Sequence, residues 1–362
     1  MSNLNRLLLC VAFVGTLSSA AFAQNPFPDN SDLSDQTPAS NLAIDANASD
    51  ANASDANADA ATADSSVAAA KGIRLGQQQK HVIKVGFKIR AGGPCQGVFA
   101  TVPVPMEWPE QKVRIIDENV SASVSNFEYR TLDDGVRQLV VQIPRLRQNE
   151  SAEAIITFEL ERNVIEGPTD TSIYVIPKKL DRSMKLFLAA SPYIESRSGV
   201  IRRAVRDVVA EKETAWEQVQ AIYDFVREKV TYKESELKGA VDTLRDGEGD
   251  CEAMTSLFIA MCRAHNVPAR MVWVTDHSYP EFYLEDDEGH GHWFPCQVSG
   301  SQAFGSMPET RPILQKGDSI RIPEKRKRER YASMYLNIRG LRGASPKIDE
   351  VLEYGATENA AP

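Results

Sequence analysis

The sequence contains few cysteines, and none stands in a metal-binding or disulfide-rich pattern. Five cysteines are widely scattered over 362 residues, without any Cys-x-x-Cys spacing. His-Glu-x-x-His is also absent, so the sequence does not predict a zinc site. His290 and His292 stand close together, but a polar loop explains this pair better than a metal. We therefore expect no metal, no cofactor and no disulfide framework, since a chain of this length can build its core unaided.

Beyond the N-terminal segment, no apolar run is long enough to span a membrane. Residues 1–23 combine Arg6, the apolar run LLLCVAFVGTL and the small residues AFA. This is the pattern of a secretory signal peptide, with cleavage expected near Ala23. We therefore expect an exported protein, periplasmic or secreted, without a membrane span in its mature form.

Basic residues are missing from the segment that follows. Residues 24–70 contain eight Asp, neither Lys nor Arg, and the repeat DANASDANASDANAD. This composition is typical of a disordered spacer, which we assign to residues 24–72. Residues 71–362 carry 40 basic and 42 acidic residues, and this balance does not favour nucleic-acid binding. The local run EKRKRER, residues 324–330, predicts a solvated turn or an edge strand.

The next segment has apolar residues with a period of two. Runs such as GVFATVPVP and EAIITFELER are separated by Gly, Pro and Asp-Gly turn signals. Such a pattern predicts antiparallel strands with one buried face. We expect a β-sandwich-like domain over residues 73–178, and it contains no recognisable catalytic constellation.

The period then changes to that of a helix. Ser198 can cap an amphipathic helix over 199–212. Thr214 and Glu217 stand at the spacing of a capping box, which predicts the start of a second helix. Strands are predicted afterwards in ARMVWV, SYPEFYL and HWFPCQ.

Between these helices and strands lies a third helical segment that is apolar nearly all round. It runs from Cys251 to Ala264, and such a helix should be central and covered on most sides. Asn266 stands where a left-handed helix stop is needed, and Pro268 prevents continuation. We expect this helix to form the centre of the second domain.

Cys251 opens this central helix directly after the glycine-rich turn GEGD. A helix N-terminus favours a thiolate and a developing oxyanion, because its N–H groups are free and its dipole is positive. His277 follows on a strand as a candidate base, and Gln297 could accept a hydrogen bond from its imidazole. Taken alone, Cys251 and His277 also fit structural core residues.

The order of these segments resembles the transglutaminase-like superfamily, whose core has a papain-like arrangement. The resemblance covers about residues 185–300 and is carried by GEGDCEAMTSLF, HNVPAR, HSYPEFYL and HWFPCQ. It implies an α+β fold over residues 179–355, in which the Cys helix packs on an antiparallel sheet.

The resemblance also implies roles for individual residues. Cys251 would be the nucleophile, His277 the base, and Gln297 stands where the family has an Asp. An amide can orient an imidazole but cannot stabilise an imidazolium by charge, so Gln297 is compatible with weak or absent activity. Asp276 and Glu281 are alternative sources of a carboxylate.

The remaining chemistry-bearing groups of this region are expected to be structural. Cys262 and Cys296 fit core packing, as do Trp273 and Trp293. Arg270 is expected to form an ion pair or hydrogen bond that holds the fold together.

The sequence thus predicts an exported cysteine enzyme that acts on peptide or carboxamide carbonyls through a thioester. Either water or an amine would release the product, and hydrolysis is slightly preferred because no acidic loop suggests a calcium site. The alternative is a catalytically weak or inactive binding module that kept the fold. The expected partner is a protein or peptide substrate.

Overall fold

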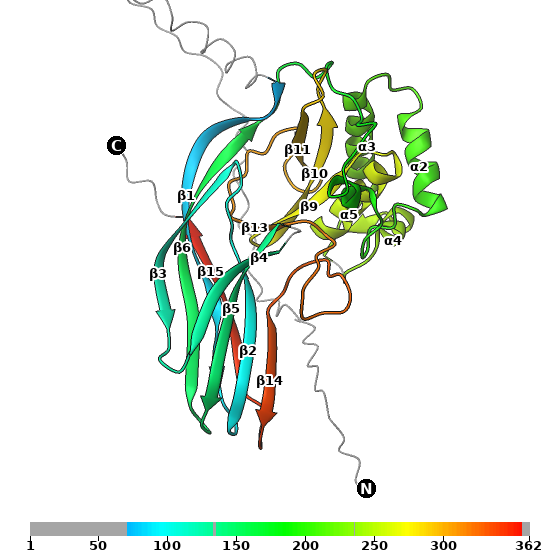
Figure 1. The fold of residues 1–362 in the computed structure, drawn as a ribbon. Helices are drawn as coiled ribbons and strands as arrows, with labels where there is room; N and C mark the ends of the chain where they lie inside the picture. Colours follow the sequence, from blue (N-terminus) through cyan, green and yellow to red (C-terminus); the bar gives the residue numbers. More distant parts are fainter. Residues whose placement is uncertain (1–70, 133–134, 235, 357–362) are drawn as a thin grey trace, which may run out of the picture. The chain divides into compact units, whose positions relative to one another are not determined.

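The computed structural model describes residues 71–132, 135–234 and 236–356, which belong to one compact unit. The expected signal segment and residues 24–70 of the expected spacer lie outside the described residues. Figure 1 shows a two-sheet half and a helix–sheet half within this unit. In the part of the chain described, no helix is long and apolar enough to cross a membrane.

The two-sheet half consists of two four-stranded antiparallel sheets. Their strand orders are β15-β1-β6-β3 and β14-β2-β5-β4. The strands are β1 (Arg74–Arg90), β2 (Cys95–Val104), β3 (Gln111–Val120), β4 (Asn126–Leu132), β5 (Val136–Leu146), β6 (Ser151–Glu166), β14 (Tyr335–Leu341) and β15 (Lys347–Ala356).

Both sheets contribute to one apolar core. Successive side chains of a strand point to opposite faces, so every second residue of a strand can reach that core. This alternation lets both sheets face one shared core, and the period-two pattern predicts such antiparallel strands. The shared cluster includes Ile83, Val85, Phe87 and Ile89 of β1, Val98, Ala100, Val102 and Val104 of β2, Leu139, Val141 and Ile143 of β5, and Ile156, Phe158 and Leu160 of β6.

The last two strands join this half rather than the helix–sheet half. Strand β15 pairs with β1 over its whole length, and β14 pairs with β2 from Tyr335 to Leu341. The sequence-based division places residues 335–355 in the second domain. Both strands lie at sheet edges and are largely exposed, so their local pattern does not indicate which sheet they complete.

The helix–sheet half contains a five-stranded sheet with the order β12-β11-β10-β9-β13 and a parallel pair, β7 with β8. Figure 1 shows helices α3 and α5 on one side of strands β9–β11. The elements are η1 (Met184–Leu188), α2 (Gly199–Val209), α3 (Ala215–Lys229), β7 (Thr231–Tyr232), α4 (Ala240–Asp246), β8 (Glu248–Gly249), α5 (Cys251–Ala264), β9 (Ala269–Val274), β10 (His277–Glu285), β11 (Gly291–Gln297), β12 (Ala303–Phe304) and β13 (Ile313–Lys316).

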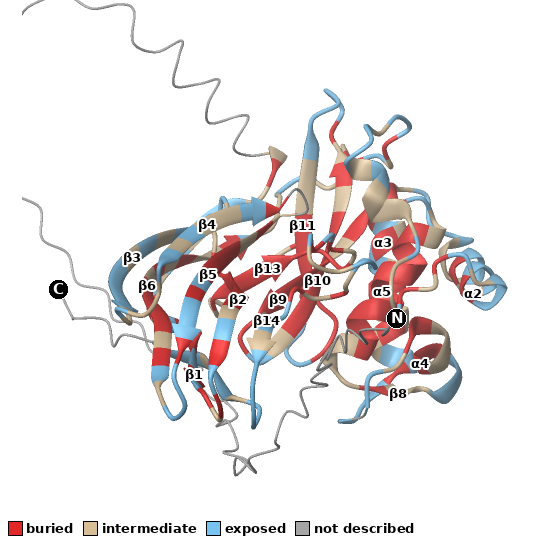
Figure 2. Ribbon diagram, turned by 60° about the horizontal axis from the view of Figure 1, so that its bottom comes forward, coloured by how far each residue is buried: buried red, intermediate tan, exposed pale blue. Residues whose placement is uncertain are grey.

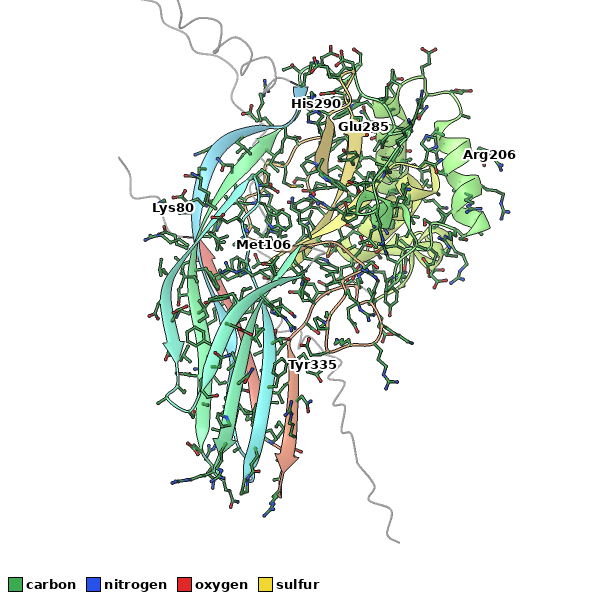
Figure 3. All side chains as sticks on the ribbon, in the orientation of Figure 1. Lys80, Met106, Arg206, Glu285, His290 and Tyr335 are labelled. Carbon is green, nitrogen blue, oxygen red and sulfur yellow. The ribbon has the colours of Figure 1, made fainter. Side chains whose placement is uncertain are left out.

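Helix α5 is the centre of this half, as predicted. Every residue from Ala253 to Arg263 is buried, because α5 contacts the other helices and also strands β9 and β10. Figure 2 shows α5 almost entirely in the buried colour, whereas α2 has an exposed outer face. Arg206 of α2 points away from the molecule in Figure 3. The helix stops before Asn266, whose φ of 62° confirms the expected left-handed residue.

The predicted helix starts are also confirmed. Ser198 accepts a hydrogen bond from the N–H of Val200 at the start of α2. Thr214 and Glu217 form both bonds of a capping box at α3, at 3.2 and 3.0 Å. These caps satisfy N–H groups that have no partner within the helix.

Buried polar groups join the two halves. Lys316 of β13 lies 2.6 Å from Glu110 of the two-sheet half and 2.5 Å from Glu281 of β10. Arg162 of β6 donates to the hydroxyl of Tyr279 on β10 at 3.1 Å. Strand β10, which begins with His277, is therefore held from both halves.

Candidate active site

The first residue of α5 is Cys251, placed by a tight turn and a capped helix start. Asp250 caps the helix by accepting from the N–H of Ala253 at 2.8 Å. The N–H groups of Cys251 and Glu252 precede the first intrahelical bond, so they remain available for an oxyanion. Gly249 permits this close packing, because a Cβ there would meet the Cβ of Ala253 at 2.8 Å.

Cys251 is also the accessible thiol among the four described cysteines. It is half-buried, whereas Cys95, Cys262 and Cys296 are each 0% exposed. Burial raises the pKa of Cys262 and Cys296 well above the ordinary range of a thiol. Their expected structural role agrees with this burial, and Cys251 is the one of the four that a reagent could reach.

The surroundings of Cys251 keep its thiol protonated at rest. Burial raises the pKa of Cys251, and the carboxylate of Asp250 raises it further. Polar groups of Ser278 act in the opposite direction, and Glu252 again raises it. A thiol with a raised pKa needs a base at the moment of attack, because little thiolate is present at neutral pH.

His277 and Gln297 are in direct contact. Nε2 of His277 lies 2.9 Å from Oε1 of Gln297, which is the partner expected from the sequence. Burial lowers the pKa of His277, the bond with Gln297 raises it, Arg311 lowers it and Glu309 raises it. The net shift is downward, so the imidazole is neutral at neutral pH and can accept a proton.

Packing of α5 on β10 brings the cysteine towards the histidine. The hydroxyl of Thr255 on α5 donates to the carbonyl of Ser278 at 3.4 Å, and Ser278 directly follows His277. The Cys251 thiol lies close enough to Ser278 for its polar groups to affect the thiol pKa. In the described part of the chain, no hydrogen bond joins Cys251 to the His277 ring, which fits a resting pair of neutral groups.

Neither alternative carboxylate is placed to replace the missing Asp. Glu281 is 2% exposed and pairs with Arg270 and Lys316, at 2.7 and 2.5 Å. Burial works against its charge, but the two cations outweigh burial and lower the pKa of Glu281. Asp276 lies in an exposed turn with a φ of 55°. The structural ion pair expected for Arg270 is therefore present, and its partner is Glu281.

A carboxylate that the sequence reasoning missed lies behind Gln297. Nε2 of Gln297 donates to Oε2 of Glu309 at 3.0 Å. Arg311 donates to the same oxygen at 2.7 Å and to the other oxygen of Glu309. Residues 308–312 form no helix or strand, so no periodic signal could have placed Glu309 near His277.

Two further residues adjoin the cysteine. Tyr232 of β7 pairs with Gly249 in the parallel bridge, is 55% exposed, and has its pKa raised by burial and then by Cys251. Arg330 ends the basic run that the sequence predicts to be solvated, and this expectation is wrong for that residue. It is 7% exposed and lies 3.2 Å from the carboxylate of Glu252, because tertiary pairing draws it inward.

His290 and His292 lie in the β10–β11 hairpin and are not part of the candidate active site. His292 is 3.0 Å from the carboxylate of Asp286, and Figure 3 shows His290 and Glu285 at the hairpin tip. Within the described residues, no group of three or more His, Cys, Asp or Glu side chains could hold a metal ion. A groove of about 590 Å³ along α2 and α3 has an acidic lining and includes none of Cys251, His277 and Gln297.

Residues 202–298, which contain Cys251, His277 and Gln297, match the family model of the transglutaminase-like superfamily. This part of the chain is therefore transglutaminase-like. The match spans α2 to β11, so the superfamily core here comprises the helices and the hairpin that carries His277 and Gln297.

One solved structure supports the fold of this chain. A candidate cysteine protease from Cytophaga hutchinsonii is 17% identical and has a TM-score of 0.53, covering 80% of this chain and 94% of that chain. A candidate protease from Parabacteroides distasonis is 11% identical, with a TM-score of 0.27 and coverage of 60% and 43%, and carries no structural argument. No curated protein matches the chain.

Proposed function

We propose that this transglutaminase-like protein is a cysteine enzyme that acts on peptide or carboxamide carbonyls through a thioester. One observation carries the proposal: the reachable thiol of Cys251 stands at a helix N-terminus beside the strand of His277, whose Nε2 is 2.9 Å from Gln297. This arrangement supports the roles of nucleophile for Cys251, base for His277 and orienting group for Gln297.

The acylation step follows from the neutral resting groups. The sulfur of Cys251 attacks the carbonyl carbon while its proton passes to Nδ1 of His277, the ring nitrogen that Gln297 does not engage. The negative oxygen of the tetrahedral adduct accepts from the N–H groups of Cys251 and Glu252. The C–N bond then breaks, His277 returns the proton to the leaving amine, and a thioester remains.

The second step releases the acyl group. Water gives up a proton to His277 and attacks the thioester carbon, and the departing sulfur regains that proton from the imidazole. A primary amine in place of water would instead form a new amide. We favour hydrolysis of a peptide substrate, since the sequence contains no acidic loop that reads as a calcium site.

A thiol-labelling experiment tests this proposal. At neutral pH, Cys251 should react with a thiol-directed probe faster than Cys262 or Cys296, and His277→Ala should slow that reaction. Peptide and Gln-donor substrates should then be profiled against the purified protein, with Cys251→Ala as the inactive control. Equal, slow labelling of all three cysteines would contradict an enzymatic role.

A second function has one specific observation in its favour. Gln297 stands in place of a carboxylate, and burial moves the pKa of Cys251 up and that of His277 down, away from an ion pair. A catalytically weak or inactive module that binds peptides would tolerate such a site. It predicts that peptides bind with the same affinity to the wild type and to Cys251→Ala, without turnover.

We further propose that the protein acts outside the cytoplasm. The signal-like pattern of residues 1–23 and the acidic, repetitive composition of residues 24–70 support export followed by a spacer. N-terminal sequencing of the protein recovered from its native cells tests this. A mature protein that begins near Gln24 is expected, and an intact N-terminus in a cytoplasmic fraction would contradict the proposal.

A further inference from the structure

A continuous chain of hydrogen bonds leads from the imidazole to an ion pair. His277 contacts Oε1 of Gln297, whose Nε2 donates to Glu309, and Glu309 accepts in turn from Arg311. Arg311 also donates to the carbonyl of Thr275 at 3.1 Å, in the turn that precedes His277. The chain of contacts is thus anchored at both ends close to the base.

The two ends of the Gln297 amide are chemically different, and Glu309 distinguishes them. An ionised carboxylate only accepts hydrogen bonds, so the NH₂ group of Gln297 must face it. The amide oxygen then faces His277 and can accept only from a protonated Nε2. In a neutral imidazole this leaves Nδ1 unprotonated, with its lone pair free to take a proton.

We propose that Glu309 is a positioning residue, which acts through Gln297 to hold His277 as the tautomer with a free Nδ1. This inference rests on the proposed function, because a free Nδ1 matters only if His277 serves as a base for Cys251. Glu309 takes over the orienting task that the superfamily's Asp would perform directly, and it does so from a segment outside the matched residues 202–298.

Glu309 acts on His277 by orienting the amide of Gln297, rather than by its own charge. Arg311 is bound to both oxygens of Glu309, and the two side chains act on the pKa of His277 in opposite directions. Their charges therefore oppose each other at the imidazole. An uncharged acceptor at position 309 should keep the Gln297 amide in place, whereas a side chain without an acceptor should release it.

The position of Glu309 itself depends on the two-sheet half. Thr310, between Glu309 and Arg311, donates from its hydroxyl to the side-chain oxygen of Gln79 on β1. Three residues after Thr310, the N–H of Ile313 donates to the side chain of Gln111 at 2.6 Å. The segment that carries Glu309 follows the matched residues 202–298, and these two hydrogen bonds fix it against the two-sheet half.

The experiment reads the tautomer directly, by ¹⁵N NMR of the histidine rings in the full-length protein. The resonances of His277 are assigned by their loss in His277→Ala. We expect an Nε2–H ring in the wild type and a mixture or the Nδ1–H ring in Glu309→Ala. Glu309→Gln should restore the wild-type tautomer, because its amide oxygen still accepts from Gln297.

A matched control removes an ion-paired glutamate elsewhere. Glu159 pairs with Arg114 at 2.8 Å on the two-sheet half, so Glu159→Ala should leave the His277 ring unchanged. Alkylation of Cys251 at neutral pH should slow by about tenfold in Glu309→Ala and recover in Glu309→Gln. An unchanged tautomer and rate in Glu309→Ala would refute the inference, as would loss of the tautomer in Glu309→Gln.

The readouts separate this inference from the proposed function. The tautomer does not depend on turnover, so a change in Glu309→Ala supports positioning even if Cys251 proves inert. A reactive Cys251 with an unchanged tautomer would instead refute only the positioning role. Should Glu309→Ala fail to fold, the His277 tautomer is compared between the near-isosteric variants Glu309→Gln and Glu309→Met. Only Gln retains an acceptor, so only Glu309→Gln should keep the wild-type tautomer.

Discussion

The two halves of the described chain differ in the ion pairs that each buries within itself. The core that the two sheets share is apolar, whereas the helix–sheet half also buries the Arg263–Asp318 pair at 1% exposure for both side chains. Lys316 and Glu281 add a second buried ion pair on β13 and β10. In the two-sheet half, the buried charged residues Glu110 and Arg162 lie where this half meets β13 and β10, at Lys316 and Tyr279.

This difference shows what each core specifies. Apolar burial is worth about 25 cal/mol per Å² and is non-directional, so it stabilises the sheets without fixing one strand to a fraction of an ångström. A buried ion pair adds little to the free energy of unfolding, but removing or displacing one partner is strongly destabilising. We infer that the helix–sheet half uses its buried pairs to fix β9, β10 and β13.

The largest expected effect comes from breaking the Arg263–Asp318 pair. Asp318→Ala leaves the buried guanidinium of Arg263 without its partner, at a contact that measures 2.7 Å. We expect the free energy of unfolding to fall by about 3–5 kcal/mol. Urea-induced unfolding followed by circular dichroism measures this.

The matched control for that variant is Glu159→Ala in the two-sheet half. It removes an exposed ion pair with Arg114 and should change the free energy of unfolding by about 0–1 kcal/mol. Equal losses in the two variants would contradict the distinction between the halves.

A smaller effect is expected where the halves meet. Glu110→Gln keeps an acceptor for Lys316 but removes its charge, while Glu281 remains bound to the same ammonium group. We expect a loss of about 1–3 kcal/mol in the free energy of unfolding. The exposed Glu107→Gln serves as the control and should stay within about 0.5 kcal/mol of the wild type. No difference between the two would show that the buried contact does not stabilise the join.

Much of the site's scaffold could be predicted from local sequence. The capping box of Thr214, the left-handed Asn266 and the apolar faces of α5 depend on residues close together in the chain, and all are present. The contact of His277 with Gln297 follows from strand alternation together with the superfamily resemblance. Local periodicity and caps are signals that short segments carry in full.

The rest depends on contacts between distant segments. Glu309 lies in irregular chain, and only tertiary packing brings it to Gln297. Arg330 is buried although its neighbours are basic, because Glu252 lies 78 residues away in sequence but adjacent in space. Residues 335–355 pair with the first two strands, β1 and β2. The composition of a strand does not indicate which neighbouring strand it pairs with.

The start of α3 provides a further, smaller prediction. Thr214→Ala removes the side-chain acceptor of the capping box from an exposed helix end. The free energy of unfolding should fall by about 1 kcal/mol, and alkylation of Cys251 should be unaffected because α3 carries no residue of the site. A clear change in the alkylation rate would show that the α3 cap influences the cysteine.

The start of α5 uses the same kind of cap beside the thiol, so the smallest change there should affect chemistry rather than stability. Asp250→Asn retains a good N-cap residue, and the free energy of unfolding should stay within about 0.5 kcal/mol of the wild type. The variant removes a negative charge that, after burial, is the largest cause of the raised pKa of Cys251.

Removing the negative charge of Asp250 should lower the pKa of Cys251. A lower thiol pKa gives more thiolate at a fixed pH, so Cys251 should be alkylated several-fold faster at pH 7 and its rate profile should move to lower pH. Burial and Glu252 still raise the pKa of the thiol, so the profile should not reach that of an exposed cysteine. Asp246→Asn, on the exposed end of α4, is the control. Slower or unchanged alkylation in Asp250→Asn would mean that the charge at the α5 cap does not govern the reactivity of Cys251.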